Sequence, residues 1–243
     1  MIRSKILFGV CTAGLAVMTQ ALPFLTIDNF DDPAGGQSAA IFNGTPGATA
    51  SSIAFGLAAL GGSRSINVEI EATILGGSSS SVEANAFTSP NNFQFTTSSK
   101  VDSKGWIVWD ANGTGLNVDF AAGSAFVLSG LDDDLATTYA IKVETFGGGS
   151  SEAAVTTAGN DAGLDLVLPF GSFSAGANWL DIDRITLLVN PPRGGDVSID
   201  SLTVQRAVPD PLATGTALLA ASALLILARG LRAVRAETED DRT

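Results

Sequence analysis

Between residues 22 and 207, apolar residues recur with period two or in short runs, and helical periodicity is nearly absent. Within Ile66–Ile74, for example, Glu69 and Glu71 alternate with apolar neighbours. Such alternation indicates a strand with one face in water and one face in a core. Clusters of Gly, Pro, Asn and Ser separate these stretches, as turns require.

The spacing of these stretches predicts an all-β domain of about a dozen short strands, arranged as a sandwich or barrel. The predicted strands are Leu25–Phe30, Ser51–Leu57, Ile66–Ile74, Val82–Ala86, Phe93–Thr96, Trp106–Trp109, Leu116–Phe120, Ala125–Leu128, Tyr139–Thr145, Ala153–Thr157, Leu164–Leu168, Ile182–Val189 and Val197–Val204.

The two ends of the chain have a different pattern. Residues 1–21 combine an early basic pair with the apolar stretch Ile6–Met18 and small residues up to Ala21, which predicts a cleaved secretory signal peptide. Near the other end, Leu212–Ala228 carries no charge and would span roughly 26 Å as a helix, so it predicts a short transmembrane helix. Residues 22–207 are therefore expected to form one exported domain, followed by a C-terminal segment, 208–243.

That C-terminal segment resembles the PEP-CTERM sorting signal of Gram-negative bacteria that make extracellular polysaccharide. The residues that carry the resemblance are Val208, Pro209, Asp210 and Pro211 before the apolar run, and Arg229, Arg232 and Arg235 after it. Asp210 stands where the family usually has Glu. The resemblance implies processing by a membrane enzyme, exosortase. It also implies inner-membrane anchoring before processing and a place at the cell surface or in the extracellular matrix afterwards. A plain C-terminal anchor is the alternative.

Charge and composition narrow the chemistry of the exported domain. Seven basic residues stand against twenty acidic ones between 22 and 207, a formal net charge of −13. Such acidity argues against nucleic acid as a partner. Histidine is absent, and the single cysteine, Cys11, lies in the predicted signal peptide. The domain therefore lacks the commonest general base, disulfides and cysteine-type metal sites.

The strands at both ends of the domain resemble those of jelly-roll carbohydrate-binding modules. The residues concerned are Thr26–Asp32 at the start, and Ile182–Leu187 and Val197–Leu202 near the end. The resemblance implies a jelly-roll-like β-sandwich whose first and last strands lie side by side.

If the end strands are neighbours, carboxylates from both come close together. Asp28, Asp196 and Asp200 are then candidate ligands of a structural calcium ion, with Asp31 and Asp32 nearby. Crowded carboxylates need a cation or must protonate, and calcium takes six to eight oxygen ligands. A second candidate calcium site is the run Asp132-Asp133-Asp134, for which a solvated loop is the alternative.

Three tryptophans are candidates for sugar contact, because the apolar faces of sugar rings stack on exposed indoles. Trp106 and Trp109 are three residues apart on one predicted strand, so they face opposite sides and one of them belongs to the core. Trp179 lies on a predicted loop between Asn178 and Asp181, and these three residues form the candidate ligand site. Core or edge packing is the alternative for each indole.

These observations favour a structural or binding role, without catalysis, at the cell surface or in an exopolysaccharide matrix. A carbohydrate-binding module is the alternative, with extracellular polysaccharide as the partner. A glycan-active enzyme that uses two carboxylates is the third hypothesis.

Overall fold

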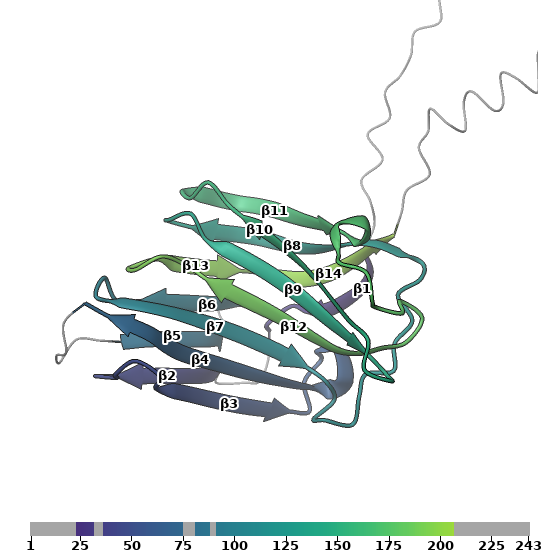
Figure 1. Cartoon of the computed structure of the whole chain (residues 1–243), viewed down its shortest axis with the longest axis horizontal. Coiled ribbons are helices and arrows are strands. Elements are labelled where there is room, and N and C mark those ends of the chain that lie inside the picture. Colours follow the sequence, from purple (N-terminus) through teal and green to yellow (C-terminus); the bar gives the residue numbers. More distant parts are fainter. Residues whose placement is uncertain (1–22, 32–35, 75–80, 88–90, 207–243) are drawn as a thin grey trace, which may run out of the picture. The chain divides into compact units, whose positions relative to one another are not determined.

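Fourteen strands form two antiparallel sheets in the computed structural model, which describes residues 23–31, 36–74, 81–87 and 91–206 (Figure 1). The eight-stranded sheet contains β1 (Pro23–Asp28), β2 (Gln37–Phe42), β5 (Ser81–Phe87), β6 (Asn92–Thr97), β8 (Gly123–Asp133), β11 (Asp161–Pro169), β13 (Asp196–Ile199) and β14 (Ser201–Arg206). The six-stranded sheet contains β3 (Thr49–Phe55), β4 (Ser63–Thr73), β7 (Val101–Trp109), β9 (Thr138–Thr145), β10 (Ser150–Thr156) and β12 (Ile182–Asn190).

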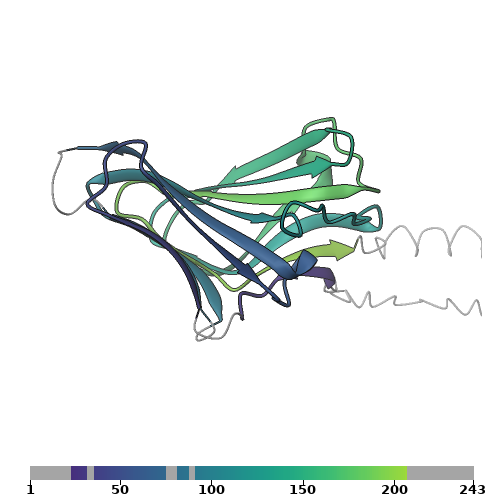
Figure 2. The same cartoon turned by 90° about the horizontal axis from the view of Figure 1, so that it is seen from below.

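The two sheets lie as two layers with the core between them (Figure 2). The six-stranded sheet has the order β10-β9-β12-β7-β4-β3. In the other sheet β1 pairs with β14, which pairs with β8, and β8 also pairs with β11. The predicted all-β, jelly-roll-like sandwich is therefore confirmed, and so is the contact between its first and last strands.

Alternating side chains build the core, as the sequence pattern predicts. On β4, Ile66, Val68 and Ile70 are completely buried, while the residues between them face solvent. The sheets approach closely at Gly105 on β7, where an added Cβ atom would lie 2.5 Å from the ring of Phe95. A larger residue at 105 would require the Phe95 ring or one of the sheets to move.

The strand predictions differ from the structure in three places. β2 was missed, because four of its six residues are Gln, Ser and Ala, which give a weak strand pattern. Leu116–Phe120 is not a strand, and only Val118 forms a bridge there, to Ile182. The predicted strand Val197–Val204 is interrupted at Asp200, which separates β13 from β14.

All fourteen strands lie in one compact unit, Leu22–Ala207. The predicted signal peptide, sorting motif and transmembrane helix fall outside the described residues. Within the described part of the chain, no helix is long and apolar enough to cross a membrane.

Candidate functional site

The strand β7 holds two tryptophans in opposite environments. Trp109 is completely buried between the sheets, whereas Trp106 lies half-buried on the solvent side of the six-stranded sheet. The opposite orientation predicted from their odd spacing is confirmed. Each indole has its own set of polar neighbours.

Trp109 belongs to a buried polar network centred on Asp28. The indole Nε1 of Trp109 donates to one carboxylate oxygen of Asp28 at 2.8 Å, and the amide of Phe30 donates to the other at 2.9 Å. Arg64 Nη1 lies within 2.9 Å of both oxygens, and Arg64 Nε donates to the side chain of Gln37. Burial raises the pKa of the Asp28 carboxyl, while Arg64, Phe30 and Trp109 pull that pKa down. Asp28 therefore already has protein donors on both oxygens.

The three candidate calcium ligands occupy separate places. Asp28 is in the buried network, and Asp200 lies at the break between β13 and β14, with its carboxylate against Gly130. Asp196 is exposed at the start of β13, where its amide donates to Asp134 Oδ1 at 2.7 Å. Among the described residues, no group of three or more His, Cys, Asp or Glu is placed to hold a metal ion. The calcium site stays a prediction.

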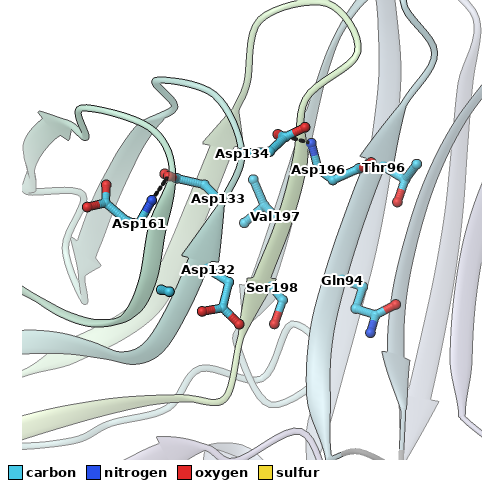
Figure 3. A pocket seen from close by; sticks show the side chains of 10 residues that line it. Gln94, Thr96, Asp132, Asp133, Asp134, Asp161, Asp196, Val197 and Ser198 are labelled. Carbon is cyan, nitrogen blue, oxygen red and sulfur yellow. Dashed lines mark hydrogen bonds between the residues drawn. The ribbon is translucent and has the colours of Figure 1, made fainter.

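An acidic groove of about 580 Å³ lies on the solvent side of the eight-stranded sheet (Figure 3). Its lining in the described part of the chain contains no lysine or arginine and consists of Gln94, Thr96, Asp132, Asp133, Asp134, Asp161, Ala162, Asp196, Val197 and Ser198. Asp132 and Asp133 were considered as loop residues from the sequence, but both lie in β8.

Asp133 is a buried acid of this groove, and Asp161 is partly buried, yet neither carboxylate indicates a bound ligand. Asp133 is 3% exposed and accepts hydrogen bonds from Tyr139 at 3.2 Å and from Thr157. One oxygen of Asp161, Oδ2, is buried and has no partner among the described residues. Figure 3 shows the Asp161 carboxylate turned away from Asp196.

A different surface surrounds Trp106 on the opposite side of the sandwich. Strand register places Asn67, Trp106, Leu188 and Ala140 side by side on β4, β7, β12 and β9. Trp106 lines two adjacent grooves. One, of about 360 Å³, extends toward β3 and includes Ile53, Ser65, Asn67, Val108, Asp110 and Arg184. The other, of about 320 Å³, extends toward β10 and includes Glu69, Lys104, Ala140, Lys142, Glu152, Thr186 and Leu188. We call these residues together the Trp106 surface.

The cations of the Trp106 surface are held in ion pairs. Lys104 Nζ lies 3.2 Å from Glu69 and 2.7 Å from Glu71, whose hydrogen bond raises the pKa of the lysine. Lys142 lies 2.5 Å from Glu144 and holds the pKa of that carboxyl below its usual value. The surface thus offers charged donors and acceptors that nearly balance one another.

A turn after β7 borders one side of this surface, at the strand ends and not across the path from β3 to β10. The amide of Gly113 donates to Asp110 Oδ1 at 3.1 Å, and the hydroxyl of Thr114 donates to the carbonyl of Ala111 at 2.7 Å. Arg184 then lies 3.4 Å from Asp110, so the turn and β12 are joined by an ion pair. Hydrogen bonds within the turn and the ion pair to Arg184 therefore hold this border in place.

Trp179 has a different setting from the one expected of a loop platform. Its ring stacks on Phe170 with 4.0 Å between the ring centres and 6° between the planes, and it also contacts Phe173 and Phe126. Asn178 Oδ1 accepts from the amide of Leu180 at 3.2 Å. Phe170 therefore covers one face of the indole. The role of Trp179, Asn178 and Asp181 in sugar contact stays a prediction.

Sequence reasoning left open which tryptophan of β7 was exposed and did not identify the Trp106 surface. A signal was available. Lys104 shares the parity of Trp106, whereas Val101 and Ile107 share the parity of Trp109. A lysine on the same strand face marks that face as the solvent side.

No family model and no curated protein matches the sequence. Solved structures with a similar chain path include the family 11 carbohydrate-binding module of a cellulosomal cellulase of Clostridium thermocellum, at 12% identity, covering 79% of this chain and 99% of that chain, with a TM-score of 0.42. Another is a family 29 carbohydrate-binding module complexed with mannohexaose, at 12% identity, covering 77% and 93%, with a TM-score of 0.36. Because both TM-scores are below 0.5, these likenesses carry no functional argument.

Proposed function

We propose that this protein binds polysaccharide without cleaving it, through the Trp106 surface. The observation that carries the proposal is one half-exposed indole between two grooves on the solvent side of a sheet. Stacking on an indole supplies the apolar contact that a sugar ring needs, and surrounding polar side chains supply hydrogen bonds. A six-stranded sheet holds these groups in place in advance, which lowers the entropic cost of binding.

The ion pairs of the nearby carboxylates support binding rather than hydrolysis. Glycoside hydrolysis needs a carboxylic acid whose pKa is raised, so that it holds its proton at neutral pH. Lys142 instead lowers the pKa of Glu144, and Glu69 is paired with Lys104. Both carboxylates are suited to accepting hydrogen bonds from hydroxyl groups.

The proposal includes the cellular setting that the chain ends indicate. Export by the residue 1–21 signal and tethering by the 212–228 helix would place the domain at the cell surface or in an exopolysaccharide matrix. Exosortase, acting at Pro209, Asp210 and Pro211, is the proposed processing partner. This part of the proposal rests on the sequence pattern of the two ends.

Affinity electrophoresis in gels that contain β-glucan, galactomannan or dextran tests the binding. We expect at least one polysaccharide to retard the exported domain and Trp106→Ala to abolish that retardation. Phe146→Ala is the matched control, because Phe146 is 74% exposed on the turn after β9, outside the Trp106 surface. Absence of retardation in all three gels, or equal retardation of Trp106→Ala and the original protein, would overturn the proposal.

A further inference from the structure

We infer that the Trp106 surface binds an internal segment of an uncharged polysaccharide that lies across the strands, an inference that rests on the proposed function. It adds two statements about the ligand: the site does not bind a chain end, and the ligand carries no charge. Each statement follows from a different property of the surface.

The first property is that the path over Trp106 reaches both edges of the sheet. One groove includes Ile53 on β3 and the other includes Glu152 on β10, and these two strands are the outermost of the six. Six strands at the usual spacing give a path of about 24 Å. Because the path ends at sheet edges, a polymer can enter at one edge and leave at the other. A site for a chain end would need a wall across that path.

The second property is the balance of charge along the path. Lys104 and Lys142 already have carboxylate partners, and Arg184 is shared between Asp110 and Glu144. A polyanion would have to displace these partners and approach a domain with a formal charge of −13. A polycation would have to displace the same three basic side chains from their carboxylate partners. Hydroxyl groups can instead donate to the carboxylates and accept from the cations without breaking the pairs.

The middle of the path is apolar, which fits a ring stacked at the centre. Leu188 and Ala140 continue outward from Trp106 on β12 and β9, and Val108 follows it on β7. Polar groups flank this apolar centre, with Asn67 beside Trp106 on β4 and Lys104 and Thr186 on β7 and β12. A chain of several sugars would therefore have one ring on the indole and its neighbours over hydrogen-bonding side chains.

Isothermal titration with oligosaccharides of two to six sugars, cut from the polysaccharide that retards the domain, tests both statements. We expect affinity to rise at least tenfold between the shortest and the longest, and borohydride reduction of the chain end to leave it unchanged. Ile53→Ser and Glu152→Gln should each weaken the longest oligosaccharide several-fold and leave the shortest unaffected. Trp106→Ala should weaken every length.

The outcomes separate the two proposals. Equal affinity at all lengths, loss of binding on end reduction, or tighter binding of alginate or chitosan than of the neutral chain would overturn the inference and leave polysaccharide binding intact. Binding that is independent of Trp106, or absent for every neutral chain, would overturn the proposed function itself.

Discussion

Trp106 and Trp109 lie three residues apart on β7. Their surroundings show how burial determines whether polar groups near an indole bond to one another or remain available to a ligand. Around Trp109, the indole, the Arg64 guanidinium and the Phe30 amide all donate to one buried carboxylate, Asp28. Around Trp106, the charged groups pair with one another at the surface and still have a face toward solvent. Hydrogen-bonding capacity is used internally in the first region and is available to a ligand in the second.

The largest effect is expected when the buried network around Asp28 is disrupted. Asp28→Ala removes the buried carboxylate that is paired with the fully buried Arg64, so we expect a loss of about 3–5 kcal/mol in the free energy of unfolding, measured by urea denaturation. Glu71→Ala removes an exposed carboxylate from Lys104 and should cost less than about 1 kcal/mol. If the two variants lost similar stability, the Asp28 network would not be the internal support described above.

Conservative exchange of each tryptophan sharpens the comparison. Trp109→Phe removes the donor to Asp28 from a buried site and should lower stability by about 1–3 kcal/mol. Trp106→Phe keeps an aromatic ring on the surface and should change stability by about 0.5 kcal/mol or less. Polysaccharide binding should show the opposite ranking of the two variants: Trp106→Phe should weaken retardation in the gels, and Trp109→Phe should not. Thermal or urea unfolding and affinity electrophoresis of the same two variants give both readings.

Local patterns explain which parts of this architecture were predictable from the sequence. Period-two alternation and short apolar runs identified thirteen of the fourteen strands at least in part, because each strand has a buried face. Asp28 was identified as a crowded carboxylate, but its partner Arg64 is 36 residues away, and no local pattern links them. Arg64 shares the inward parity of Ile66 and Val68, so a buried counter-ion was required, although its identity depends on tertiary packing.

Loop residues were the least predictable. Trp179 follows Gly, Ala and Asn, a composition typical of an exposed turn, yet Phe170 and Phe173 from the preceding segment pack against it. The polarity of a loop does not show which aromatic side chains fold back over it. The Trp106 surface was difficult to predict for a different reason, because a grooved sheet face is assembled from six strands distant in sequence.

The smallest expected effect concerns Asp133. In contrast to Asp28, this buried carboxylate accepts hydrogen bonds from the uncharged side chains of Tyr139 and Thr157. Tyr139, the only tyrosine, is completely buried and donates to Asp133. Burial, reinforced by the negative charge of Asp133, raises the pKa of the Tyr139 phenol well above its usual value. An unfolded tyrosine releases its proton near pH 10, whereas the folded one keeps it, so stability should fall as pH rises above about 10.

That loss should amount to about 1 kcal/mol per pH unit above pH 10, and Tyr139→Phe should remove it. Urea unfolding of both proteins between pH 8 and about pH 11 measures the difference in slope, and tyrosinate absorbance should appear only together with unfolding. All other titratable groups are the same in the two proteins, so their contributions cancel in the comparison. Identical slopes, or tyrosinate in the folded protein, would show that Tyr139 is accessible to water. The contrast between closed internal networks and the open Trp106 surface would then hold only at Asp28.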